Sequence, residues 1–199
     1  MRENNTHIQR GGVVYEASHL DVDSHKAVFG GYHFAIAQAT HKFDGCELVD
    51  KTGNLRNKPA DYRDLYQLLG TFTVLDPKGN QMHVTYASPG TAEYYRKTGK
   101  FPDGAGERNI WNGSRSKLTT GDAHWAWGTK VWFIKIKDEK HRFPQNALWG
   151  DGWGWFLYKS DAPDKQVATD YKKDCLSCHV PAQSTDWTYV QGFPVLKSK

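Results

Sequence analysis

The sequence lacks any apolar run approaching the roughly eighteen residues that a membrane-spanning helix needs. It also lacks a concentration of positive charge, because its formal net charge is only +4 and its lysine and arginine residues are scattered among acidic ones. Nucleic-acid-binding domains instead gather basic residues on one face. We therefore predict no membrane span and no nucleic-acid partner. The mild positive charge favours a solvated surface that steers a small acidic protein partner.

Sulfur is also scarce, with three cysteine and two methionine residues among 199. Aromatic residues, in contrast, make up 14% of the chain and include eight tryptophans. Large flat side chains bury much surface each, so they could wall a planar cofactor or fill a small β-rich core equally well. The length suits one well-packed domain.

The first 39 residues carry little usable pattern. Lys26, a short semi-apolar run and the ending Ala37-Gln38-Ala39 are the parts of a secretory signal, although two glycines interrupt the apolar region. The alternative is an N-terminal strand or helix of the folded domain. We predict that residues 1–39 are an N-terminal extension containing a degenerate signal segment, and that residues 40–199 form the folded domain.

Hydrophobic periodicity and breaker residues predict two helices in the first half of that domain. One runs from Pro59 to Leu69 and is ended by Gly70. The other covers residues 91–98, with Ser88-Pro89 as its cap and first-turn pair.

Alternating apolar residues predict strands, and turn residues separate them. Residues 76–80 are predicted as a turn, and residues 104–128, rich in Gly, Asn, Ser and Thr, as a loop with at most one strand. The predicted strands lie at residues 71–75, 82–86, 130–137 and 153–158. The fold class predicted from these elements is α+β, as a single domain with a mostly antiparallel sheet.

The run Cys175-Leu-Ser-Cys178-His179 has the C-x-x-C-H spacing of c-type haem attachment. Each thiol adds to one vinyl group of the haem, and the adjacent histidine reaches the iron. Cys175 and His179 are four residues apart, which is one turn of a helix. The preceding residues 169–174 are predicted to begin that helix with a cap. We predict one haem c per chain, held near the C-terminus by Cys175 and Cys178, with His179 as the iron ligand.

Two other readings of the motif are weaker. A structural zinc ion needs a fourth ligand, which Cys46 could supply, but an adjacent Cys and His rarely bind one tetrahedral ion together. A thioredoxin-like redox pair belongs in a βαβ unit near the start of its domain, whereas this pair lies near the C-terminus. Cys46 is predicted to be an unpaired, buried small residue.

Haem attachment implies a compartment and a distal site. Covalent c-type maturation takes place outside the bacterial cytoplasm, so we predict an exported, periplasmic protein. Electron carriers commonly use methionine as the second axial ligand, but only Met1 and Met82 exist here, and Met82 lies in a predicted strand beside His83. An open distal position is therefore favoured over a simple electron carrier. Such a position binds small molecules such as nitric oxide, carbon monoxide or hydroxylamine.

Several segments, in the order in which they follow one another along the chain, resemble the cytochrome P460 family. The resemblance is carried by Leu148-Trp-Gly-Asp-Gly-Trp-Gly-Trp155 and by residues 60–63, 94–104, 132–138, 168–182 and 185–196, and it covers about residues 43–197. It implies a predominantly antiparallel sheet with flanking helices, a homodimer, and a five-coordinate haem with an open distal face. Some members oxidise hydroxylamine or handle nitric oxide, with a lysine bonded to the haem ring and a distal carboxylate. The related cytochromes c′-β lack that crosslink and carry an aromatic distal cap.

The sequence departs from the hydroxylamine-oxidising members at two positions. The position expected to hold the crosslinking lysine falls on Asn109, and the nearest later lysine is Lys117. The position of the distal carboxylate falls on Phe133. Phe133 could be an ordinary core residue; we predict that it lines the haem pocket as the distal cap, on the strand face opposite Trp132.

Two functions follow from the resemblance. Hydroxylamine oxidation needs an electron-transfer partner protein and a distal proton acceptor, for which Glu107, Asp122 and Asp151 are candidates that the sequence does not separate. The alternative is a gas-binding protein without turnover, which the absence of lysine at position 109 favours.

Overall fold

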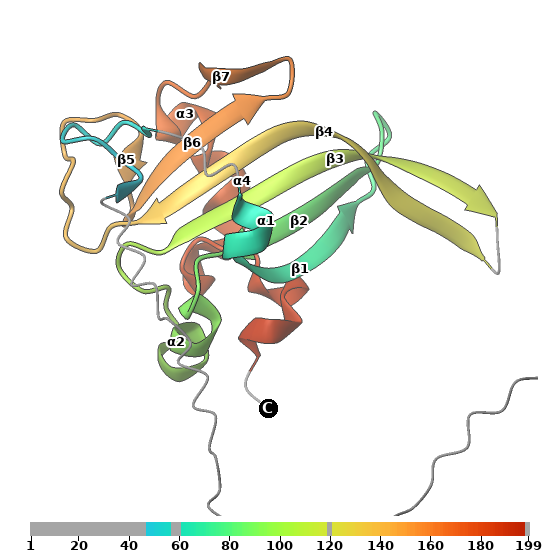
Figure 1. Cartoon of the computed structure of the whole chain (residues 1–199), viewed down its shortest axis with the longest axis horizontal. Coiled ribbons are helices and arrows are strands. Elements are labelled where there is room, and N and C mark those ends of the chain that lie inside the picture. Colours follow the sequence, from blue (N-terminus) through green and yellow to red (C-terminus); the bar gives the residue numbers. More distant parts are fainter. Residues whose placement is uncertain (1–46, 57–60, 119–120, 198–199) are drawn as a thin grey trace, which may run out of the picture. The chain divides into compact units, whose positions relative to one another are not determined.

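The computed structural model describes residues 47–56, 61–118 and 121–197. Within them the chain forms a seven-stranded antiparallel sheet in the order β1-β2-β3-β4-β6-β5, and β7 pairs with β6 (Figure 1). The few helices are short. The prediction of an α+β domain with a mostly antiparallel sheet is confirmed. In this part of the chain no helix is long and apolar enough to cross a membrane.

The predicted helix from Pro59 to Leu69 is mostly wrong. Helix α1 covers only Tyr62–Leu65, and strand β1 begins at once as Gln67–Val74. The register of β1 shifts between Leu68 and Gly70, so Leu69 is an extra residue there, and its side chain is almost completely buried. Because of this bulge, two apolar residues, Leu68 and Leu69, follow one another in the strand. Apolar residues spaced in this way also occur on the apolar face of a helix, which explains the wrong prediction.

Strand β2 covers Gln81–Ala87 and pairs with β1 as predicted. The turn between them is also confirmed, because the Gly79 N–H donates to the Asp76 carbonyl at 2.8 Å. Helix α2 covers Thr91–Thr98 and is ended by Gly99, which has φ +71°. Its predicted cap is wrong, because Gly90 occupies the cap position.

The predicted loop at residues 104–128 is wrong, because strands β3 (Gly106–Leu118) and β4 (Asp122–Lys137) form one long hairpin there. Two register shifts beside Asn112 break its alternation, and a Cβ added at Gly113 would make a tight contact, 3.1 Å from the Trp127 carbonyl.

Among the described residues, no strand pairs with the outer part of this hairpin on either side. The ladder with β2 ends at Gly113, and the ladder with the next strand, β6, reaches only to Val131. Residues 114–118 and 122–127, here called the β3–β4 arm, therefore project as a two-stranded ribbon (Figure 1).

The remaining strands are β5 (Trp149–Gly150), β6 (Trp153–Lys159) and β7 (Ala162–Gln166). The strands predicted at residues 130–137 and 153–158 are thereby confirmed. Much of the largest core cluster is aromatic, and its most deeply buried side chains include Phe101, Trp153, Trp155, Phe156 and Phe193.

The C-x-x-C-H motif lies in the last described segment of the chain. Its elements are the helices α3 (Tyr171–Asp174) and α4 (Leu176–His179) and the 3₁₀ helices η2 (Val180–Thr185), η3 (Val190–Gly192) and η4 (Pro194–Leu196). The Asp170 carboxylate caps α3 by accepting from the Lys172 N–H at 2.9 Å, which confirms the predicted cap. The predicted continuous helix is corrected, because Cys175 has φ −129° and separates α3 from α4.

Candidate functional site

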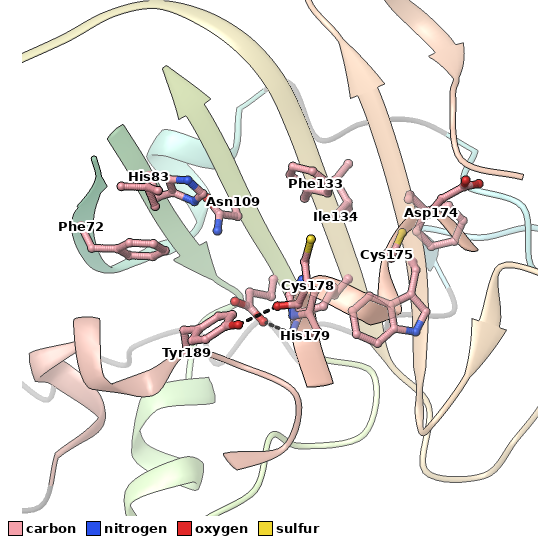
Figure 2. A pocket seen from close by; sticks show the side chains of 15 residues that line it. Phe72, His83, Asn109, Phe133, Ile134, Asp174, Cys175, Cys178, His179 and Tyr189 are labelled. Atoms are coloured by element: carbon pink, nitrogen blue, oxygen red, sulfur yellow. Dashed lines mark hydrogen bonds and ion pairs between the residues drawn. The ribbon is translucent and has the colours of Figure 1, made fainter. Parts of the chain in front are cut away.

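A cavity of about 350 Å³ lies between the sheet and the helices α3 and α4. Strands β1 to β4 and β6 supply one part of its lining, and the C-x-x-C-H segment supplies the other (Figure 2). Of the residues predicted as site residues, Cys175, Cys178, His179 and Phe133 all line this cavity, as does Asn109. The fold thus brings the motif to the sheet position predicted as the distal cap.

The two cysteine side chains differ in exposure and are free of disulfides. Cys175 is buried, and burial together with the charges of Asp174 and Cys178 raises the pKa of its thiol to about 12. Cys178 is exposed. A thiol with a raised pKa is a poor nucleophile at neutral pH, so the environment of Cys175 argues against a thioredoxin-like redox pair.

The His179 ring is fixed by a backbone carbonyl. Its Nδ1 lies 2.9 Å from the Trp187 carbonyl oxygen, and the ring contacts Trp155 edge-on with centroids 4.9 Å apart. A carbonyl only accepts, so Nδ1 carries the hydrogen and Nε2 keeps its lone pair. Burial and the nearby Lys135 charge lower the pKa of His179 to about 4, although the hydrogen bond to the Trp187 carbonyl opposes the shift. The imidazole is neutral at pH 7, which is the form that binds a metal.

Behind His179 lies a buried ion pair. The Lys135 ammonium lies 2.9 Å from Glu107 Oε2, and both side chains are almost completely buried. It also donates to Thr188 Oγ1 at 2.6 Å and to the Trp187 carbonyl at 3.0 Å. Burial lowers the pKa of Lys135, and the Glu107 carboxylate opposes that shift.

On the sheet side of the cavity Asn109 is accompanied by His83, which the sequence did not predict as part of the site (Figure 2). His83 is 5% exposed and stacks on Phe72, with ring centroids 4.5 Å apart. Burial lowers the pKa of His83 to about 4, and a hydrogen bond with Asn109 opposes the shift. Its imidazole is therefore neutral at pH 7.

These residues fit a haem. Two thiols stand beside a neutral imidazole whose Nε2 is available, and the cavity has aromatic walls that include Phe72, Phe133 and Trp155. Residues 59–190 match the family model described as Cytochrome P460. The chain belongs to the cytochrome P460 family. Membership of this family of haem proteins implies haem binding. No curated protein matches the sequence.

The other candidate residues of this cytochrome P460 family member occupy several places in the fold. Lys117 is exposed on the β3–β4 arm, and Asp122 begins β4 at the far end of that arm. Asp151 accepts a hydrogen bond from the Tyr171 hydroxyl at 3.1 Å and does not line the cavity. Glu107 lines the cavity but is held by Lys135.

The zinc alternative is not supported by the part of the chain that the structure describes. No three His, Cys, Asp or Glu side chains in this part are placed to hold a metal ion. Cys46, the fourth ligand which that alternative required, lies outside the described residues, as do residues 1–39 with their predicted signal segment.

Proposed function

We propose that this chain carries one haem c, bound by thioether bonds to Cys175 and Cys178 and ligated by His179, and that its open distal face binds nitric oxide or carbon monoxide. When bound, the haem supplies an iron with one coordination position for a small ligand. The observation that carries the proposal is that the C-x-x-C-H segment, Phe133 and Asn109 line one and the same cavity. Position 109, where a crosslinking lysine is expected, holds an asparagine.

The lysines of the described residues support a haem without a lysine crosslink. Lys117 is eight residues beyond Asn109 on strand β3, which corresponds to roughly 26 Å along an extended strand. Among these lysines, Lys135 is the one that lines the cavity, and its ammonium is engaged by Glu107, Thr188 and the Trp187 carbonyl. The gas-binding function of the cytochrome c′-β type is therefore favoured over hydroxylamine oxidation.

Phe133 acts as the distal cap in this proposal. It is half-buried and lines the cavity. Trp132, its neighbour along β4, does not line the cavity and packs against the main core as well as against the cluster of Tyr62, Tyr66 and Ile110. An aromatic ring over the open coordination position repels water and slows the approach of small ligands.

Hydroxylamine oxidation remains the second candidate, and one observation favours it. His83 is a neutral imidazole in the wall of the cavity, and a ring nitrogen of a neutral imidazole can accept a proton from a bound substrate. Its lowered pKa makes it a weak base at pH 7, so proton transfer to it would be transient. This reaction would also require an electron-transfer partner protein.

We further propose that the protein is a periplasmic homodimer and that the β3–β4 arm is its dimer contact. The arm exposes Trp125 and Trp127 on one of its faces, with exposed fractions of 41% and 55%. A two-stranded ribbon alone is marginally stable in water, and exposed apolar groups on unpaired strands favour a second copy as the cover. The periplasmic location rests on covalent haem attachment, which takes place outside the bacterial cytoplasm.

The deciding experiment uses protein produced with the c-type maturation machinery. Titration of the dithionite-reduced protein with carbon monoxide should give one binding site per chain. Hydroxylamine should fail to reduce an added electron acceptor above the rate of the free reagents. Saturable acceptor reduction in the wild type that is lost in His83→Leu would overturn the gas-binding proposal and establish the second candidate.

A further inference from the structure

One backbone oxygen lies between the proposed iron ligand and a buried cation. The Trp187 carbonyl oxygen is 2.9 Å from His179 Nδ1 and 3.0 Å from the Lys135 ammonium. The two donors come from distant parts of the chain, because Lys135 lies on β4 and His179 ends α4. The carbonyl is therefore shared by a neutral donor and a charged one.

The position of the Lys135 ammonium is fixed from several sides. Glu107 Oε2 and Thr188 Oγ1 accept from it, and the Thr188 hydroxyl in turn donates to Glu107 Oε2 at 3.1 Å. The ammonium also lies 4.2 Å from the centroid of the Trp153 ring. With 7% of its side chain exposed, Lys135 holds a charge that water screens little.

Resting on the proposed function, we infer that Lys135 is a positioning residue that sets how strongly His179 donates electrons to the haem iron. A histidine ligand becomes more basic when its other ring nitrogen donates a strong hydrogen bond. Lys135 polarises the Trp187 carbonyl towards itself and so weakens the bond that the carbonyl makes with His179. Weaker donation by His179 favours the ferrous state and a longer bond between His179 and the iron.

The ion pair allows a charge-neutral test. In Lys135→Met/Glu107→Gln the carbonyl loses its second donor while the net charge near the haem stays the same. We expect the equilibrium constant for reduction to fall about tenfold, which is 59 mV for one electron. The iron–histidine stretching frequency of the ferrous protein should rise. Both readouts report on His179 directly and do not require catalytic activity.

A matched control lies two residues further along β4. Lys137 forms a neighbouring ion pair with Asp186 at 2.6 Å, and no bond to the Trp187 carbonyl is seen. Lys137→Met/Asp186→Asn removes a similar charge pair from a similar depth and should leave both readouts at the wild-type values. Equal shifts in the two double variants would overturn the inference, because the effect would then be a general response to losing a buried pair.

A single variant keeps the test decisive if the double variant does not fold. Glu107→Gln preserves the shape of the side chain but replaces a carboxylate with a neutral amide, which accepts more weakly from the Lys135 ammonium. The ammonium should therefore bond more strongly to the Trp187 carbonyl. The stretching frequency should then fall, opposite to the double variant. An unchanged or raised frequency contradicts the inference. Absence of covalent haem in the wild type would instead contradict the proposed function, so the two failures are distinguishable.

Discussion

Asn109 and Phe133 are direct cross-strand partners in the β3–β4 ladder, and both line the cavity that holds the C-x-x-C-H segment. Side chains paired in this way have Cβ atoms about 4.5–5.5 Å apart. These are the two positions at which the family resemblance leads us to expect a crosslinking lysine and a distal carboxylate, so both departures fall in one small patch of the cavity wall. A neutral amide and an aromatic ring occupy the patch where a lysine and a carboxylate would otherwise meet.

Phe133→Ala should speed carbon monoxide association with the reduced protein. If the ring contributes about 1.4 kcal/mol to the barrier, the rate should rise about tenfold. Flash photolysis measures this rate. Trp132→Phe is the matched control, because Trp132 neighbours Phe133 on β4 but does not line the cavity, so its replacement should leave the rate unchanged. An unaltered rate in Phe133→Ala would mean that Phe133 is not the cap.

The buried His83 predicts a dependence of stability on pH. Its pKa is about 4 in the folded protein, against 6.5 for an unperturbed histidine. The unfolded chain therefore binds the proton first, so the stability contributed by neutral His83 is present above pH 6.5 and is lost as the pH falls towards 4. The loss at pH 4.5 should be roughly 2–3 kcal/mol.

Denaturant unfolding of the wild type and His83→Leu at pH 7 and pH 4.5 measures this contribution. The variant should lose less free energy of unfolding than the wild type over the same interval. Equal losses in the two proteins would show that His83 is not held neutral in the cavity.

The cysteine variants test the attachment of the haem. Cys175→Ala and Cys178→Ala each leave one thioether bond, so each should retain haem through acid–acetone extraction. Cys175→Ala/Cys178→Ala should release all of it. Mass spectrometry of the extracted chain gives the result, and covalent haem in the double variant would contradict the assignment of both cysteines.

Variants of the β3–β4 arm test the proposed dimer. Trp125→Ser/Trp127→Ser should convert a dimer to a monomer in sedimentation velocity without changing the haem spectrum. Ser116 pairs with His124 and lies one residue from the partner of Trp125, so it points to the opposite face of the arm. Ser116→Glu should accordingly leave the dimer intact. A dimer that survives the double tryptophan variant places the interface elsewhere.

The parts of the site that could be predicted are those encoded by local spacing or by the family pattern. The C-x-x-C-H motif is contiguous, so Cys175, Cys178 and His179 could be named from the sequence alone. Phe133 was predicted from the position where the family resemblance places the distal carboxylate. The alternation of β4 correctly predicted that Trp132 does not line the same wall. Strands with uninterrupted alternation, such as the one at residues 153–158, were predicted for the same reason.

His83 and Lys135 were missed because their roles depend on pairing between distant segments. His83 reaches the cavity because β2 pairs with β3, which places it near Asn109, and no local signal distinguishes it from a core histidine. The sequence pattern alone predicts that Lys135 faces solvent on an amphipathic strand. In the structure the C-terminal segment covers that face, because Trp187 and Thr188 accept from the Lys135 ammonium. The β3–β4 hairpin was missed because bulges beside Asn112 interrupt its alternation.

The optical spectrum of the ferric and then the dithionite-reduced protein tests the central claim most directly. An unmodified haem c on Cys175 and Cys178, with His179 on one side and an open position on the other, predicts an ordinary five-coordinate, high-spin ferrous spectrum. A strongly red-shifted ferrous Soret band would contradict the account by revealing a chemically modified ring. A six-coordinate, low-spin spectrum would contradict it by showing that a side chain such as His83 closes the distal position.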